Sequence, residues 1–334
     1  MISLRHLKIG FRYIAYRFNR LHPYEVQAQL LNACDMRCIY CRCPDVKTQL
    51  LKSDQWKMIL HSLGNLGTLR VKFQGGEPTL HPDFRQLCAE AKNAGLLTAT
   101  VTNGVRISSQ PALLDYLDEL VVSLDSLKPE VNDYLRGKGA YDKAVKAIRI
   151  SQERGVHTYI SMAVCQCNIS DVAAMLDFCE ERGIMMNAQP VIFGRDYYDD
   201  KAKNIGLSPD QIRLVHQKQA EWKQQGRNIL FSPQAYLKAL TWPDLANLTS
   251  KSEEESACRA GKDYVHIEPN GDVWPCIQHG ADFTPKNILR DGIYESFYHV
   301  QHHNCGDCWS AYLNERKLLF GLKPSAMREM IRRG

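Results

Sequence analysis

The chain lacks a long apolar segment. None of its runs approaches the roughly eighteen apolar residues that a membrane-spanning helix needs, although 44% of the 334 residues are hydrophobic. The N-terminus also lacks an apolar stretch followed by a small-residue cleavage site, which argues against a secretory signal. We therefore expect a cytoplasmic protein whose thiols stay reduced. Its twelve cysteines then indicate metal ligands or core residues rather than disulfides.

Acidic residues are missing from the first 24 positions, although the chain as a whole has 37 of them. The same segment holds five basic residues, which account for the whole formal net charge of +5. Because the remaining chain carries no net charge, we expect no nucleic-acid partner. The five basic residues are Arg5, Lys8, Arg12, Arg17 and Arg20.

Apolar residues in this N-terminal segment recur every three or four positions, as they do on one face of a helix. They are Leu4, Leu7, Phe11, Ile14, Phe18 and Leu21. The pattern predicts a basic amphipathic helix within residues 1–24. Such a helix packs on the main domain, which we expect. The alternatives are peripheral contact with an anionic membrane surface and docking of a partner.

No internal repeat or low-complexity segment occurs in the remaining sequence, where strand and helix patterns alternate instead. Strands are expected at residues 26–31, 70–74, 96–101, 119–124, 157–164 and 185–192. Helices are expected at residues 53–63, 82–94, 140–154, 171–182 and 209–225, and Ser53 and Ser208 are expected to cap the first and the last. This order predicts an α/β fold with a parallel sheet, whose functional residues lie at the carboxyl ends of the strands.

The composition changes after a polar stretch at residues 250–256, beyond which cysteine, histidine, glycine and aromatic residues are frequent. We therefore predict three parts of the chain. They are the N-terminal helix in residues 1–24, a core domain in residues 25–235 and a small C-terminal domain in residues 236–334.

Three cysteines with the spacing C-x3-C-x2-C follow the first expected strand: Cys34, Cys38 and Cys41. Three thiolates can bind three irons of a 4Fe–4S cluster and leave the fourth iron open for another ligand. The alternatives are a zinc knuckle and a chance group of buried thiols. Zinc requires four closed ligands, and Cys43 as the fourth would give a run too tight to surround one tetrahedral ion.

The sequence "GGEP", at Gly75, Gly76, Glu77 and Pro78, ends the second expected strand. Together with the cysteine spacing and the aromatic Tyr40 before the last cysteine, it resembles the signature of the radical S-adenosylmethionine (SAM) enzymes. The resemblance covers roughly residues 25–195. It implies a partial (β/α)6 TIM-like barrel that binds a 4Fe–4S cluster and SAM.

The resemblance also implies roles for single residues. Cys34, Cys38 and Cys41 would bind the cluster, and the "GGEP" motif would receive the amino group of the methionine part of SAM. Ser123 and Asp125, at the end of the fourth strand, would contact its ribose or carboxylate. Arg136 is a further candidate for the carboxylate.

A second group of cysteines lies near the C-terminus: Cys258, Cys276, Cys305 and Cys308. A structural zinc held by four thiolates is one interpretation. The segment around "GDVWPC" resembles instead the SPASM domain of radical SAM enzymes, in the shortened form called twitch, because no cysteine follows Cys308. That resemblance implies an auxiliary 4Fe–4S cluster. With four thiolate ligands the auxiliary cluster would accept an electron from a substrate radical rather than bind the substrate.

The remaining cysteines are expected to have simpler roles. Cys165 and Cys167 alternate at the end of the fifth strand, where a thiol can donate a hydrogen atom to a product radical, but core packing is the expected role. Cys88 and Cys179 lie inside predicted helices and are expected in the core. The role of Cys43 stays open.

These observations predict a radical SAM oxidoreductase or maturase that receives electrons from a flavodoxin or ferredoxin. The resemblance implies that it cleaves SAM to a 5′-deoxyadenosyl radical, which abstracts a substrate hydrogen. Because only about 24 residues precede the first strand, we expect a small-molecule substrate such as an alcohol, sugar or lipid precursor. The alternatives are a maturase of a ribosomally made peptide and a non-catalytic iron–sulfur electron-transfer protein.

Overall fold

The computed structural model describes residues 22–192, 200–251, 258–278, 283–303, 305–321 and 323. Residues 1–21 lie outside this set, so the N-terminal helix and its membrane contact stay predictions. Every helix within the described residues is too short or too polar to cross a membrane.

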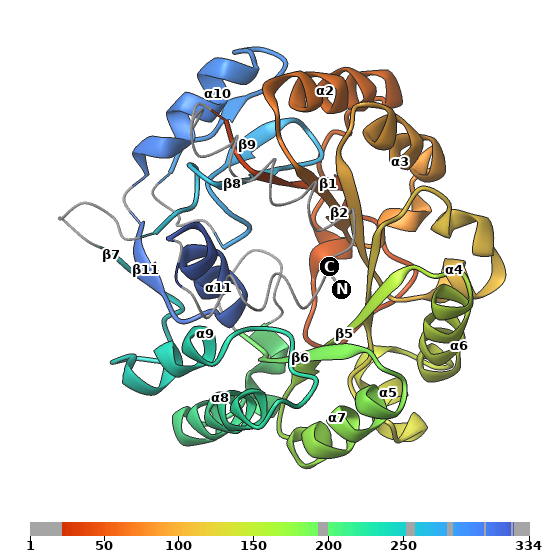
Figure 1. Cartoon of the computed structure of the whole chain (residues 1–334), viewed down its shortest axis with the longest axis vertical. Coiled ribbons are helices and arrows are strands. Elements are labelled where there is room, and N and C mark those ends of the chain that lie inside the picture. The colour runs from red at the N-terminus through yellow and green to blue at the C-terminus, as the bar shows by residue number, and fades with distance from the viewer. Residues whose placement is uncertain are drawn as a thin grey trace.

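Six parallel strands form the main part of one sheet, and they follow one another in chain order (Figure 1). Each strand is short and largely buried, as expected for a parallel sheet that helices cover. The strands are β1 (Glu25–Leu31), β2 (Arg70–Gly75), β3 (Leu97–Thr102), β4 (Glu119–Ser123), β5 (His157–Val164) and β6 (Met185–Pro190).

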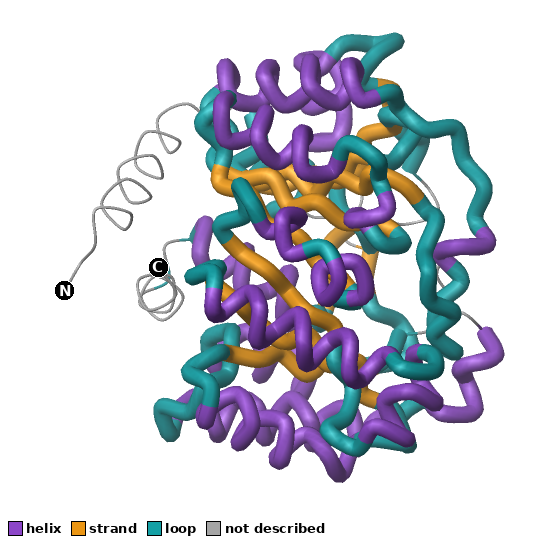
Figure 2. Tube along the Cα trace, turned by 90° about the vertical axis from the view of Figure 1, so that its right-hand side faces the viewer, coloured by secondary structure: helices purple, strands orange, loops and turns teal. Residues whose placement is uncertain are grey.

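Helices cover the outer face of this sheet, and Figure 2 shows the strands enclosed between them. They are α2 (Ser53–Leu66), α3 (Phe84–Asn93), α4 (Val105–Ser109), α5 (Pro129–Arg136), α6 (Ala140–Glu153), α7 (Val172–Glu181) and α8 (Pro209–Gln224). The predicted α/β fold, a partial TIM-like barrel, is confirmed. Its strand ends agree with the sequence prediction to within two residues.

The two predicted helix caps have different outcomes. Ser208 caps α8, since its hydroxyl accepts a hydrogen bond from the Gln211 amide at 3.3 Å. The expectation for Ser53 is wrong, because Ser53 is the first residue of α2 and Lys52 is its N-cap. The Ser53 hydroxyl instead donates a hydrogen bond to Asp83, which joins the start of α2 to the start of α3.

The C-terminal residues extend the same sheet. Strand β8 (Tyr264–Ile267) pairs in parallel with β1, and β9 (Asp272–Trp274) and β10 (Lys286–Asn287) continue from it in antiparallel fashion. The sheet order is therefore β10-β9-β8-β1-β2-β3-β4-β5-β6. Figure 1 shows β8 and β9 in blue beside β1 in red. The remaining elements are α9 (Pro233–Leu237), β7 (Thr249–Lys251), α10 (Ile293–His299), β11 (Cys305–Cys308) and α11 (Ala311–Phe320).

Helix α11 closes the N-terminal end of the barrel, opposite the carboxyl ends of the strands. Its Arg316 and Tyr312 both donate hydrogen bonds to Glu25 at the start of β1, the latter at 3.0 Å. Burial acts to raise the Glu25 pKa, but Arg316 and Arg70 lower it to about 2, so the carboxylate stays charged. The C-terminal segment thus packs into the barrel, and the domain boundary at residue 235 stays a prediction.

Candidate active site

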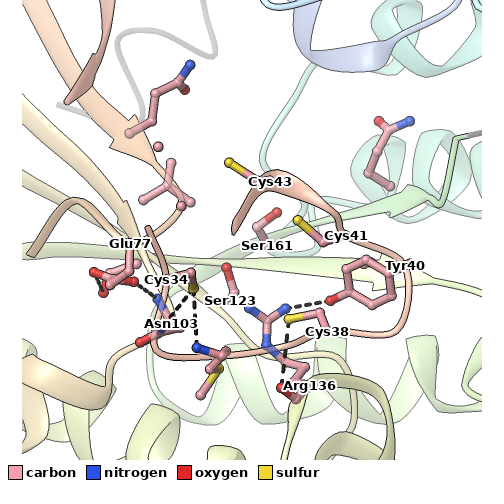
Figure 3. A pocket seen from close by; sticks show the side chains of 18 of the residues that line it. Cys34, Cys38, Tyr40, Cys41, Cys43, Glu77, Asn103, Ser123, Arg136 and Ser161 are labelled. Carbon is pink, nitrogen blue, oxygen red and sulfur yellow. Dashed lines mark hydrogen bonds between the residues drawn. The ribbon is translucent and has the colours of Figure 1, made fainter. Parts of the chain in front are cut away.

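A cavity of about 350 Å³ lies at the carboxyl ends of the barrel strands. Parallel strands present their carboxyl ends at one edge of a sheet, so residues distant in sequence meet there. Residues from β1, β2, β3, β4, β5 and β6 all line it, as do the cysteine loop after β1 and two C-terminal residues, Ile277 and Gln278. Figure 3 shows the labelled side chains of Cys34, Cys38 and Cys41 with those of Glu77 and Ser123 around this space.

The three motif cysteines lie on this loop and line the cavity, and each side chain is partly exposed. The Met36 amide donates a hydrogen bond to Cys34 Sγ at 3.4 Å, and Cys38 Sγ lies 3.9 Å from the Arg136 carbonyl oxygen. Burial raises the pKa of Cys34 to about 12 and raises that of Cys41 as well. Burial thus opposes ionisation of these thiols, and a bound cation would favour their thiolate forms.

A buried ion pair holds the cysteine loop in place. Arg136 Nη1 lies 3.1 Å from Asp125 Oδ2, and both groups bond to the hydroxyl of Tyr40, which stands between Cys38 and Cys41. Burial acts to lower the Arg136 pKa, but Tyr40 and Asp125 raise it above its ordinary value, so the guanidinium stays charged. Ala163 N also donates to Asp125 Oδ1 at 2.9 Å.

These contacts place Asp125 beneath the cavity rather than in its wall. Its side chain is fully buried and both carboxylate oxygens accept hydrogen bonds from protein groups. We infer that Asp125 positions the cysteine loop through Tyr40, whereas the sequence suggested contact with SAM. Ser123 and Arg136 do line the cavity, and Pro78 does not belong to its lining.

Replacing Asp125 by asparagine is expected to lower the free energy of unfolding by about 3–5 kcal/mol, because it leaves the buried Arg136 charge unpaired. Denaturant unfolding of anaerobically purified protein measures this change. The control is Asp54→Asn, which removes an ion pair with Lys57. The Asp54 side chain is 92% exposed, so this change should lower the free energy of unfolding by less than about 1 kcal/mol. Equal losses in the two variants would contradict the positioning role.

The two glycines of the "GGEP" motif are required by a close approach between β2 and the end of β1. A Cβ on Gly75 would lie 2.2 Å from the Leu31 carbonyl oxygen, and one on Gly76 would lie 2.2 Å from that of Asn32. Gly75 also has a φ of +150°, which disfavours side chains. The Gly76 amide donates to the Leu31 carbonyl at 2.9 Å. The motif is thereby fixed against the chain that leads into the cysteine loop.

Glu77 lies in the cavity wall, but its carboxylate is already bonded. One oxygen accepts hydrogen bonds from Thr79 and Thr102, and the other accepts one from the Asn103 amide at 2.7 Å. Burial raises the Glu77 pKa, although these hydrogen bonds act to lower it. Contact between this motif and the methionine amino group stays a proposal.

Asn103 belongs to the sequence "TNG" at the end of the third strand, where functional residues are expected, although the sequence assigned it no role. Its side-chain amide donates to Asp35 Oδ1 at 2.6 Å and lies 3.8 Å from Cys34 Sγ. It therefore joins the "GGEP" loop to the cysteine loop. The sequence also gave no signal for Ser161, which lines the cavity from β5.

The second group of cysteines also comes together. The Cys305 thiol is hydrogen-bonded to Cys258, which lowers the pKa of Cys258 to about 7. Burial raises the pKa of Tyr264, and so does its proximity to Cys258, Cys276 and Cys308. Three of these cysteines are buried and Cys305 is partly exposed. Four thiols separated by up to 50 positions are therefore neighbours.

Neither group has the geometry of a closed site for one ion. Within the described residues, no three Cys, His, Asp or Glu side chains are arranged to hold a single metal ion. A tetrahedral zinc ion needs its ligands to converge on one point, whereas the thiolates of a 4Fe–4S cluster bind separate irons around a larger body. Clustered, spaced thiols fit the iron–sulfur interpretation.

The other cysteines divide between core and surface. Cys88 and Cys179 are fully buried, as expected. Cys165 is also buried and packs with Tyr40 and Leu135, whereas Cys167 is exposed. The expected core packing is therefore confirmed for Cys165 and wrong for Cys167. Neither thiol lines the cavity, as a hydrogen-atom donor would. Cys43 lines the cavity beside the motif cysteines.

The cavity extends from the first cysteine group to residues that neighbour the second group in sequence. Ile277 and Gln278, which line it, directly follow Cys276. The Gln278 amide donates a hydrogen bond to Cys276 Sγ at 3.3 Å. A molecule in the cavity therefore touches the loop of the first group and the chain beside the second.

Comparison with known proteins agrees with this geometry. Residues 29–179 match the Radical SAM superfamily. The chain is 30% identical over 286 residues to the mycofactocin maturase MftC of Mycolicibacterium smegmatis, covering 81% of this chain and 68% of that protein. It is 27% identical over 299 residues to the PqqA peptide cyclase of Methylorubrum populi, covering 86% and 72%.

The crystal structure of Streptococcus suis SuiB bound to S-adenosylmethionine has the same fold. The TM-score is 0.66 at 22% sequence identity, over 88% of this chain and 70% of SuiB. The fold, the grouped thiols and the sequence relatives agree with the motif resemblance. The chain belongs to the radical SAM superfamily.

Proposed function

We propose that this enzyme is a maturase that oxidises, or forms a bond within, a ribosomally made peptide. The observation that carries the proposal is the single cavity lined by all three motif cysteines and by the chain that follows Cys276. A substrate there would contact the first cysteine group and the two residues that follow Cys276 of the second group. Among the relatives, MftC is named a maturase and the PqqA peptide cyclase is named for a peptide.

The family binds a 4Fe–4S cluster and SAM, and its SPASM-type members carry auxiliary clusters. We propose that Cys34, Cys38 and Cys41 hold the first cluster, and that the four C-terminal cysteines hold the auxiliary one. The first cluster would supply the electron for the reductive cleavage of SAM, and the auxiliary cluster would accept the electron that an oxidation of the substrate releases.

The residues of the chain then bind and orient the reactants. The backbone of the "GGEP" motif is held rigidly against β1 and offers a fixed surface for the methionine amino group. The hydroxyls of Ser123 and Ser161 line the cavity from β4 and β5, where a ribose can bond to them. Burial of Glu77 and Arg136 keeps charged groups out of contact with water near the reaction.

The expected small-molecule substrate is not supported by these relatives, and the peptide alternative fits them better. The expectation rested on the few residues before β1, a feature unrelated to the cavity. A non-catalytic electron-transfer role does not fit either, because the chain is related to named enzymes over most of its length. A flavodoxin or ferredoxin as electron donor stays part of the proposal.

The probe is a synthetic peptide, called the test peptide. Its sequence is that of the short reading frame expected beside the gene of a peptide maturase. Reconstituted enzyme is incubated anaerobically with SAM, a reductant and this peptide, and the products are analysed by mass spectrometry. We expect the peptide to lose hydrogen atoms in pairs, with formation of 5′-deoxyadenosine. An unchanged peptide, with 5′-deoxyadenosine formed equally with and without it, would contradict the proposal.

A further inference from the structure

Among the polar side chains that line the cavity, carboxamides outnumber charged groups. Its only formally charged lining residues within the described chain are Glu77 and Arg136, and each is bonded to protein groups. Four glutamines from four separate segments line it, more than any other residue type except cysteine. They are Gln29, Gln74, Gln189 and Gln278. A carboxamide offers both a donor and an acceptor, as a peptide amide does.

Of the four glutamines, Gln189 is the one whose two polar side-chain atoms both lack a partner within the described residues. Neither Nε2 nor Oε1 has a hydrogen-bond partner among the described residues, and both atoms are shielded from solvent. In contrast, Gln29 bonds to Asn32, and Gln74 bonds to His266 at 3.2 Å. A buried polar atom without a partner costs roughly 1–3 kcal/mol. Such a cost is typical of a site that a ligand completes.

The position of Gln189 separates it from the groups assigned to SAM. Those groups follow β1 and β2 or lie on β4 and β5, whereas Gln189 is the next-to-last residue of β6, the last strand of the sheet. The other end of the sheet is formed by the C-terminal strands, from which Ile277 and Gln278 follow. Gln189 therefore lies in the part of the cavity wall that the cofactor assignments leave free.

We infer that Gln189 is a specificity-determining residue whose carboxamide makes paired hydrogen bonds to an amide of the peptide substrate. This inference rests on the proposed function. The neutral surroundings indicate that the substrate group held here is uncharged, either a backbone amide or a carboxamide side chain. A charged substrate group beside Gln189 would lack a counter-charge there, because Glu77 and Arg136 lie on other elements and are bonded to protein groups.

The test is Gln189→Leu, a change of similar volume that removes both polar atoms. The affinity for the test peptide should fall about tenfold, which corresponds to one or two hydrogen bonds. The affinity for SAM, measured by calorimetry on cluster-loaded enzyme without peptide, should stay within twofold. The melting temperature of the free enzyme should rise, because an unpaired buried amide is replaced by an apolar group.

Two further variants keep the test decisive. Gln189→Glu keeps the shape but removes the donor, so it should also weaken peptide binding. It takes the place of the leucine variant if that variant does not fold. Gln224→Leu, an exposed glutamine on α8, is the control and should bind the peptide normally. Weakened SAM binding with normal peptide binding, or unchanged binding of both, overturns the inference. If wild-type enzyme does not modify the peptide at all, the proposed function itself fails.

Discussion

Replacing Cys34 by alanine should reduce SAM cleavage to background and remove about four irons from each chain. Cys34 belongs to the C-x3-C-x2-C loop and lines the cavity. With only two thiolates left, the loop can no longer hold a cluster that leaves one iron open. The measurements are iron and acid-labile sulfide content, and 5′-deoxyadenosine formed from SAM under a strong reductant.

Cys43→Ala is the matched control, because Cys43 lies on the same loop and also lines the cavity. Cys43 is buried, and its thiol lies 3.8 Å from the Asn32 carbonyl oxygen. It does not belong to the C-x3-C-x2-C motif. We expect this variant to keep its iron and its SAM cleavage. Continued 5′-deoxyadenosine formation by Cys34→Ala, or equal iron loss in both variants, contradicts the assignment.

Replacing Cys276 by alanine should separate the two chemical steps. About four irons should again be lost, because the second group would have only three thiolates in a buried site. SAM cleavage should continue, since the first group is intact. Oxidation of the test peptide should stop, because no acceptor remains for the electron that the oxidation releases. Mass spectrometry of the peptide and 5′-deoxyadenosine assays measure the two steps separately.

Cys179→Ala is the control for this variant. Cys179 is fully buried in α7 and belongs to the hydrophobic core, so its replacement should cost about 1 kcal/mol of stability without loss of iron. Full peptide oxidation by Cys276→Ala would show that the second group has no part in the reaction. Loss of SAM cleavage in the same variant would show that the two groups do not act as separate sites.

The barrel could be predicted from the sequence because each of its strands and helices has a pattern within its own few residues. A parallel strand buried on both faces is a short apolar run, and glycines such as Gly155 and Gly183 end the helices between the strands. Strand β5 was predicted with its observed ends, His157 and Val164. The cysteine spacing and the "GGEP" motif were equally visible, since each lies within a few residues of a strand end.

The contacts that complete the site join residues far apart in sequence. The bond between Tyr40 and Asp125 spans 85 positions, so neither residue revealed the other. Asp125 was interpreted from its place at a strand end, which does not show whether a side chain faces the cavity or the protein beneath it. The pairing of β8 with β1 and the role of Ile277 as a wall residue are likewise set by packing.

The most direct test of this account is electron paramagnetic resonance of the anaerobically reduced protein before and after addition of SAM. We expect signals from two 4Fe–4S clusters, of which SAM alters one, because only the cluster held by Cys34, Cys38 and Cys41 has an open iron. The altered signal should be missing from Cys34→Ala and present in Cys276→Ala. A protein that contains zinc without sulfide, or cluster signals that SAM leaves unchanged, would contradict it.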